Sequence, residues 1–400
     1  MTTPQQETVP FGAAAASGAR RPTWPQTRHW VLAAALAVAI AAPFFFHGFV
    51  IFQLTEVMIY GLAILGLNLL TGFNGQFSVG HGAFYGLGAY VTAIMMQRWG
   101  IAYYWTLPAA GGVCFVVGVL VGLPALRLQG LYLALVTFAA AVALPQLLKF
   151  HGFEGWTGGV QGIVVDQPDV PGFLPISADQ WLYFFTLGVM LLMFAGASNL
   201  IRSRTGRAIM AIRDHPIAAA AMGINAPVYK TLTFGVSALY TGVAGALGAL
   251  AVQFVAPDSF TLFLSISFLV GLIIGGMGSL PGCLFGGLFV LYVPNIAESV
   301  SRGLAGAVYG VIMLLVIFAM PSGAAGFVRH AAGYLSRWRN PPPEPAGQNL
   351  AAPQNAYIGQ QQAAGFAVRQ PPGIVEEQAL RITAQEALTT AKQERSRKPK

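Results

Sequence analysis

The stretch TGFNGQFSVGHGAFYGLGAY, residues 71–90, decides how the rest of the chain is interpreted. It places six glycines and several small polar residues between two strongly apolar runs. Glycine-rich loops often bind phosphate, because their backbone N–H groups can approach an anion closely. Here Gly80, Gly82 and Gly86 give the spacing G-x-G-x-x-x-G, and no strand-like run precedes them. This pattern argues against a nucleotide site.

Composition indicates a membrane protein. Of 400 residues, 55% are hydrophobic and 9% are charged, whereas a soluble domain averages roughly 25% charged residues. Apolar runs of about 20 residues are long enough to cross a bilayer. Such runs lie at residues 30–46, 54–70, 104–126, 128–148, 181–201, 232–254, 262–277, 282–297 and 303–320. With the glycine-rich stretch as a tenth, the fold class is an all-α polytopic membrane protein. We expect about ten transmembrane helices and a glycine-rich discontinuous or re-entrant segment.

The distribution of charge predicts the orientation. Residues 202–230 carry five basic residues against the single acid Asp214, whereas residues 150–180 carry four acids and neither lysine nor arginine. Short loops rich in lysine and arginine stay in the cytoplasm. We therefore expect 202–230 inside and 150–180 outside, and ten spans then leave both chain ends in the cytoplasm. The net charge of +8 reflects topology and the tail, so nucleic-acid binding is not indicated.

Three regions follow along the chain. Residues 1–29 form a cytoplasmic leader and residues 322–400 a basic cytoplasmic tail, both expected to be disordered. Residues 30–321 form the transmembrane domain. Cys114 and Cys283 both fall in apolar runs, where cysteine behaves as a small buried hydrophobe.

Polar residues of the glycine-rich region lie at or beside membrane depth. Unpartnered polar groups are costly there, so they face other helices or a water-filled path. Glycines also permit an interrupted backbone where protein covers it. Two interpretations stay open, a polar seam between helices and the wall of a translocation path. The residues concerned are Asn68, Asn74, Gln76, Ser78, Gly80, His81 and Gly82.

A second glycine-rich segment, GGMGSLPGCLFGG at residues 275–287, echoes the first. Paired segments interrupted by glycine or proline can mark an inverted repeat around a site at the bilayer midplane. Small residues at four-residue spacing, such as Gly118 with Gly122, also let helix backbones approach closely. Plain helix packing is the preferred interpretation for most of these glycines.

The inside loop RSRTGRAIMAIRDHPIAAAAMGINAPVYK, residues 202–230, has more structure than a topological signal requires. Pro216 is placed to begin a helical turn, and Gly223 followed by Asn225 is a helix stop. A short helix with its own stop signal suits docking to a cytoplasmic partner.

Five ordered motifs resemble those of the LivM-type permeases of branched-chain amino acid ABC importers. They are NLLTGFNGQFSVGHGAFYGLGAY, LRLQGLYLALVTFA, TGGVQGI, RSRTGRAIMAIRDHPIAAAAMGIN and GGMGSLPGCLFGGLF. The resemblance covers residues 54–320. It implies a ten-helix, multi-pass subunit of the bacterial cytoplasmic (inner) membrane that forms the path for branched-chain or related small amino acids.

The resemblance also implies the partners. These are a LivH-type permease, two cytoplasmic ATP-binding subunits, an external or periplasmic solute-binding protein, a small amino-acid substrate and membrane lipid. Residues of the inside loop match the family's coupling helix, which seats on the ATPase. They are Arg207, Arg213, Asp214, Ala218, Ala219, Ala220 and Gly223. At Ala220 the family commonly has glutamate, so a charged contact is either missing or supplied elsewhere.

No ATPase site is expected in this chain. A Walker A loop needs Gly-Lys-Ser/Thr, and no lysine follows a glycine; ATP would be used by partner subunits, with no cofactor bound here. A permease of the same type for urea or short amides is an alternative. An ion-coupled transporter would draw on Glu56, Asp258 or Glu298. A membrane enzyme is a third class, but the six histidines form no H-E-x-x-H pattern and no catalytic or metal residue is assigned.

Overall fold

The computed structural model describes residues 25–46, 48–125, 130–170, 175–300, 303–319, 323–324 and 326. Within them the first helix begins at Pro25, ahead of the span expected from residue 30. The rest of the expected leader and almost all of the expected tail lie outside the described residues, so their predicted disorder stays a prediction.

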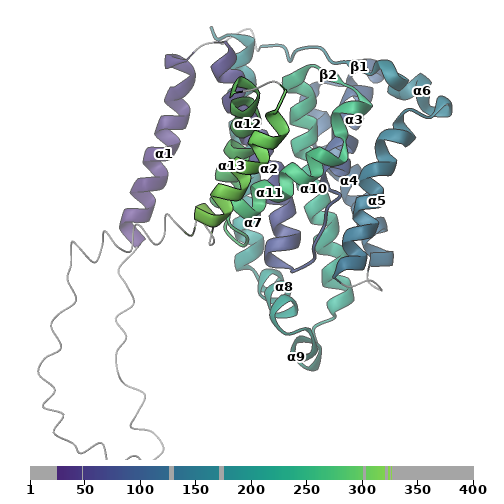
Figure 1. The fold of residues 1–400 in the computed structure, drawn as a ribbon, viewed down its shortest axis with the longest axis vertical. Helices are drawn as coiled ribbons and strands as arrows, with labels where there is room; N and C mark the ends of the chain where they lie inside the picture. The colour runs from purple at the N-terminus through teal and green to yellow at the C-terminus, as the bar shows by residue number, and fades with distance from the viewer. Residues whose placement is uncertain are drawn as a thin grey trace, which may run out of the picture. The chain divides into compact units, whose positions relative to one another are not determined.

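The described chain is mostly helical, as Figure 1 shows. The long helices are α1 (Pro25–Phe45), α2 (Phe49–Leu67), α3 (His81–Trp99), α4 (Tyr103–Ala125), α5 (Leu131–Leu148), α7 (Ala178–Arg202), α10 (Ala226–Val252), α11 (Leu262–Gly275), α12 (Gly282–Val300) and α13 (Ala305–Ala319). The short ones are α6 (His151–Thr157), α8 (Arg204–Asp214) and α9 (Pro216–Ala221). The sequence-based fold class, an all-α polytopic membrane protein, is therefore confirmed at this level.

Fewer helices meet the criteria for a membrane span than the ten expected. Among the described residues, five are long and apolar enough by themselves, and α5 with α6 makes a sixth candidate across an 80° bend. The five are Phe49–Phe73, Tyr103–Leu123, Ala178–Arg202, Ala226–Val252 and Gly282–Val300. Shorter apolar helices lie at Ala33–Phe45, Leu262–Gly275 and Gly306–Val316. The count of ten spans stays a prediction.

Helix α10 forms the centre of the helical unit, packed between α2, α3 and α4. Glycines make this contact close: a Cβ atom built on Gly88 of α3 would overlap the carbonyl of Gly242, and one on Gly245 would overlap the carbonyl of Tyr85. A Cβ on Gly118 of α4 would likewise press on Ala238 of α10, at 2.5 Å. The predicted packing role of small residues is thus confirmed at these helix crossings.

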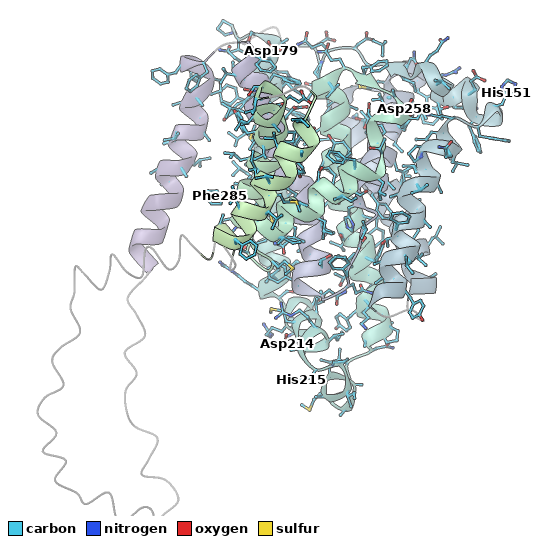
Figure 2. The ribbon with its side chains drawn as sticks, in the orientation of Figure 1. His151, Asp179, Asp214, His215, Asp258 and Phe285 are labelled. Carbon is cyan, nitrogen blue, oxygen red and sulfur yellow. The ribbon has the colours of Figure 1, made fainter. Side chains whose placement is uncertain are left out.

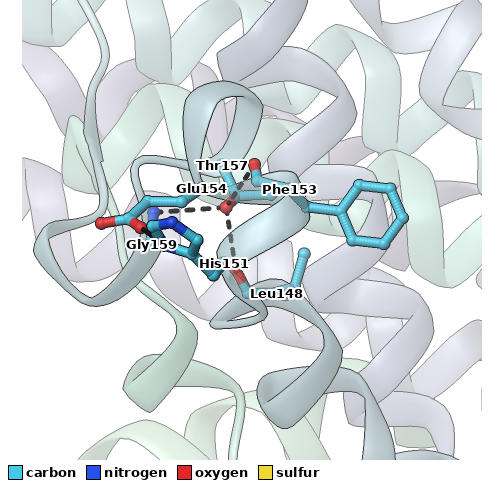
Figure 3. Close-up of polar contacts among 6 residues, drawn as sticks. All are labelled: Leu148, His151, Phe153, Glu154, Thr157 and Gly159. Atoms are coloured by element: carbon cyan, nitrogen blue, oxygen red, sulfur yellow. Dashed lines mark hydrogen bonds and ion pairs between the residues drawn. The ribbon is translucent and has the colours of Figure 1, made fainter.

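The α5–α6 corner is held by local hydrogen bonds, which Figure 3 shows. The hydroxyl of Thr157 lies 2.8 Å from the Leu148 carbonyl oxygen and 3.1 Å from that of Phe153, and it accepts a bond from the Gly159 N–H. These bonds satisfy the carbonyl at the end of α5 that continuation of the helix would have satisfied. The chain therefore turns sharply and α6 lies across the end of α5.

The described part of residues 150–180 contains short elements of secondary structure. It contains α6, a 3₁₀ turn η2 (Gly159–Gln161) and a two-residue strand β1 (Ile163–Val164). Strand β1 pairs antiparallel with β2 (Phe254–Val255), which follows α10. A salt bridge between Lys149 and Asp258 lies nearby in the fold. The loop is thereby joined to the end of α10.

The two loops of opposite charge lie at opposite ends of the helical unit. Figures 1 and 2 show α6, β1, β2, His151 and Asp258 at one end, and α8, α9, Asp214 and His215 at the other. This separation is what the charge-based topology requires of residues 150–180 and 202–230.

Candidate functional site

The glycine-rich stretch interrupts the helical path of the chain. Helix α2 runs directly into a π-helix, η1 (Asn68–Phe73), and the backbone is then irregular until α3 begins at His81. Gly75 has a φ of +72°, a conformation that suits glycine. π-helical turns within α-helices are rare and occur frequently at functional sites. The interruption falls within the glycine-rich region, and the discontinuous or re-entrant membrane segment expected there stays a prediction.

Asn68 joins this interruption to the second glycine-rich segment. Its side-chain oxygen accepts a hydrogen bond from the Gly278 N–H at 2.9 Å, and its amide donates to the Ser279 carbonyl at 3.0 Å. The amide also lies 3.3 Å from the sulfur of Cys283. A Cβ atom on Gly72 would overlap the Asn68 side chain, so a glycine there leaves room for this arrangement. The two segments that resemble each other in sequence are therefore in direct contact.

His81 links three helices. Its Nδ1 lies 3.0 Å from the Ser78 hydroxyl and its Nε2 lies 2.6 Å from the Ser237 hydroxyl of α10. Ser237 donates its only proton to the Gly66 carbonyl of α2, at 2.6 Å. The Ser237 oxygen must therefore accept from His81, which places a proton on Nε2. For a neutral imidazole, Nδ1 then accepts from Ser78.

Gly80 and Gly82 lie where the chain passes close to other helices. A Cβ on Gly80 would overlap the backbone of Thr137 in α5, and the Gly82 N–H donates to the Ser265 hydroxyl of α11 at 2.9 Å. A leucine at either position would disrupt packing inside this chain. A loss of transport in such a variant would therefore not show that the residue lines a translocation path.

The remaining polar residues of the stretch bond to one another. The Asn74 amide donates to the Gln76 side-chain oxygen at 2.7 Å. All seven residues singled out from the sequence are buried, and the structure brings them against α5, α10, α11 and the loop before α12. Their contacts are those of a polar seam between helices. A role as the wall of a path is not tested by these contacts.

Within residues 202–230, helices α8 and α9 form a two-helix arm. Ser203 caps α8, and α9 begins at Pro216 as the sequence predicted. Gly223, with φ +80°, ends α9, and the Ile224 N–H bonds back to the Ala219 carbonyl. This is the αL helix stop that glycine favours. Both the predicted start and the predicted stop are confirmed.

Arg213 connects the arm to the interrupted helix. Its guanidinium donates to the Gly72 carbonyl at 2.8 Å and also to the Asp214 carboxylate at 2.9 Å. Its aliphatic stem passes over Gly75, because a Cβ on that glycine would lie 2.7 Å from the stem. The sequence placed Arg213 only in a loop that faces a partner. No local signal indicated a contact with a residue 141 positions away.

The exposed surface of α9 is apolar. Ile217 is 86% exposed and Met222 is 83% exposed, whereas Ala219 is 4% exposed and faces the arm's own interior. Ala218, Ala220 and Gly223 are also exposed. Sequence reasoning emphasised the alanines and missed the two large side chains, because the loop holds several other large apolar residues and only its fold decides which of them are exposed.

Other candidate sites are limited within the described part of the chain. No cluster of three or more metal-ligating side chains occurs there. Asp258 pairs with Lys149, Glu298 is exposed, and Arg207 is exposed and donates to the Arg202 carbonyl. Glu56 is partly buried and lines a cavity between α2, α11 and α12.

The fold and these sites define a multi-pass helical membrane protein with a polar, glycine-rich interior and an exposed arm at its basic end. The chain belongs to the family of permease components of branched-chain amino acid transport systems, whose model matches residues 49–317. No solved structure matches it.

Named relatives belong to both permease types of these systems. The permease protein LivM of Salmonella typhimurium is 34% identical over 271 residues, covering 62% of this chain and 63% of that protein. LivM of Escherichia coli is 30% identical over 321 residues, covering 74% and 75%. LivH of Escherichia coli is 27% identical over 308 residues, covering 67% and 91%. The chain thus spans slightly less than two thirds of the Salmonella protein.

Proposed function

We propose that this chain is a permease subunit of an ATP-driven importer, carrying branched-chain or related small amino acids across a bacterial inner membrane. Ten spans, including the interrupted one, would place both termini in the cytoplasm. Its partners would be a LivH-type permease, two ATP-binding subunits that use the ATP, and an external solute-binding protein. Family membership over residues 49–317 supports this function.

The observation that carries the mechanism is the contact between Arg213 and the Gly72 carbonyl. The apolar surface of α9, with Ile217 and Met222, suits a groove on an ATP-binding subunit. Movement of the docked arm would pull on the end of η1 through Arg213. Asn68 in η1 holds the loop before α12, so the displacement would reach both glycine-rich segments. Such coupling travels through contiguous hydrogen-bonded contacts.

Uptake by the purified complex tests the function. The chain, a LivH-type permease, the ATP-binding subunits and the binding protein would be reconstituted in vesicles and supplied with L-leucine or urea. ATP-dependent leucine uptake that survives proton and sodium ionophores is expected. Uptake of urea alone would favour the amide-type permease, and uptake that ionophores abolish without ATP would favour ion coupling.

Cysteine labelling tests the orientation. Val164 in β1 is 67% exposed and Thr205 in α8 is exposed, while the native Cys114 and Cys283 are buried. A membrane-impermeant thiol reagent applied outside intact cells is expected to modify V164C and to leave T205C unmodified. The positive charge of residues 202–230 is the physical reason. The reverse labelling would overturn the topology.

Two adjacent substitutions separate the internal contact of Arg213 from its ion pair. Asp214→Ala removes only a pair whose side chains are 37% and 57% exposed, and such pairs contribute about 0–1 kcal/mol. Arg213→Ala also removes the bond to Gly72. We expect leucine uptake to fall about three- to tenfold for Arg213→Ala, because charge-assisted bonds are the stronger kind, and to change little for Asp214→Ala. If both variants reduced leucine uptake equally, the bond between Arg213 and Gly72 would not be part of the coupling route.

A further inference from the structure

A cavity of about 460 Å³ lies between α2, the start of α11 and the second half of α12. Its volume is in the range of about 300–1,000 Å³ that small-molecule sites occupy. The lining includes Ser259 of the 3₁₀ turn η3 (Pro257–Phe260), which follows β2. The cavity therefore lies toward the end of the unit that carries β1, β2 and Asp258, and not toward the α8–α9 arm.

Among the described residues that line the cavity, Glu56 is the acidic one. The described lining residues include no lysine, arginine or histidine, and no described residue forms a salt bridge with Glu56. An ionisable side chain that is partly buried between the helices of a membrane protein is costly without a partner and is a candidate functional position. Asp258, by contrast, already has Lys149 as its partner. Glu56 is thus an acidic lining residue of the cavity without a salt bridge to a described residue.

The rest of the lining combines apolar side chains with neutral hydrogen-bonding groups, as a solute with both apolar and polar parts requires. Apolar side chains form one part of it, including Phe52, Leu264 and Leu291. Neutral hydrogen-bonding groups form another, namely Gln53, Tyr60, Ser267 and Asn295. Pro294 within α12 has no N–H, so the carbonyl of Val290 lacks its helical donor, and both residues line the cavity. This carbonyl belongs to a lining residue and has no donor from its own helix.

We propose that this cavity binds the transported solute as a zwitterionic amino acid with an apolar side chain, and that Glu56 pairs with its α-ammonium group. The inference rests on the proposed function and extends it to the part of the solute that is recognised. An ammonium supplies the positive charge that the cavity lacks, and the solute side chain would lie against Phe52, Leu264 and Leu291. Urea and short amides carry no such charge, so the carboxylate would give them no advantage.

Glu56→Gln is the direct test, because it keeps the shape of the side chain and removes its charge. In the reconstituted complex, L-leucine uptake by this variant is expected to fall about 10- to 100-fold, as for the loss of a charge-assisted hydrogen bond. Glu298→Gln is the matched control. Glu298 is an exposed carboxylate on α12, whose second half lines the cavity, but Glu298 itself is not a lining residue. Co-purification of the subunits checks assembly of both variants.

A binding measurement makes the test independent of transport. A cysteine in place of the exposed Asn295 at the cavity would be modified by a water-soluble thiol reagent in the purified complex. L-leucine is expected to slow this modification, and 4-methylpentanoate, which has the same skeleton without the amine, is not. The protection by leucine should disappear when Glu56→Gln is added.

The outcomes separate this site from the function itself. If the wild-type complex carries no amino acid, the proposed function fails. If it carries leucine and Glu56→Gln carries leucine equally well, the site fails while the function stands. Equal protection by leucine and 4-methylpentanoate would also overturn the site, because apolar fit alone would then explain it.

Discussion

Leucine uptake is expected to fall to background when Ile217 on α9 is replaced with glutamate. This side chain is 86% exposed in the isolated chain, so its replacement costs the permease little internal packing. Burying a side chain of this size in a partner's groove contributes about 1.5–3 kcal/mol, and a carboxylate in the same groove would instead carry a desolvation cost. The permease should therefore insert normally but lose its ATP-binding subunits.

The comparison that isolates α9 is Thr205→Glu. Thr205 is exposed in the first turn of α8, so this variant makes the same change in charge at the same end of the molecule, but outside α9. Acidic residues are also favourable in the first turn of a helix. Uptake by vesicles and co-purification of the ATP-binding subunits should be near wild type for Thr205→Glu and lost for Ile217→Glu. Normal uptake and co-purification in Ile217→Glu would show that α9 does not dock.

Asn68→Ala is expected to destabilise the permease and abolish transport together. The substitution removes the acceptor of the Gly278 N–H and the donor to the Ser279 carbonyl, at a residue with 0% exposure. Each of the two lost hydrogen bonds contributes about 0.5–1.5 kcal/mol, and the lost side chain leaves a void at a buried position. The contact between the two glycine-rich segments would open.

Thermal unfolding in detergent and reactivity of Cys283 measure this effect. Asn68 lies against the sulfur of Cys283, which is buried in the native chain. Asn68→Ala should lower the unfolding temperature and expose Cys283 to a thiol reagent at temperatures where the wild type is protected. Asn199→Ala, at an exposed asparagine of α7, is the control and should change neither. An unaltered unfolding temperature for Asn68→Ala would exclude Asn68 as a structural joint.

The sequence predicted those features that depend on local patterns. Apolar runs located the long helices, because length and hydropathy decide which segments leave water. Pro216 and Gly223 located the limits of α9, because both act on their own backbone. The glycine-rich stretch located the interruption between α2 and α3 for the same reason.

Features that depend on contacts between distant segments were not predicted. The bond from Arg213 to Gly72 and the pairing of β1 with β2 join residues far apart in the chain, and neither has a spacing rule. The direction in which Ala219 faces was missed because the fold of the arm, and not the composition of α9, decides it. Polar residues of the stretch were recognised, but which partners they bond to required the positions of α5, α10 and α11.

The continuity of α10 has a consequence for how the two ends of the protein communicate. This helix starts at the Asn225 cap, directly after the α8–α9 arm, and is followed at its far end by β2, which holds β1. Its 27 residues make a rod about 40 Å long without an internal break. Because α10 is continuous, a translation along its axis or a rotation about it at one end would also move the other end. We therefore expect the end of the unit at β1 and β2 and the end at the α8–α9 arm to move together rather than independently.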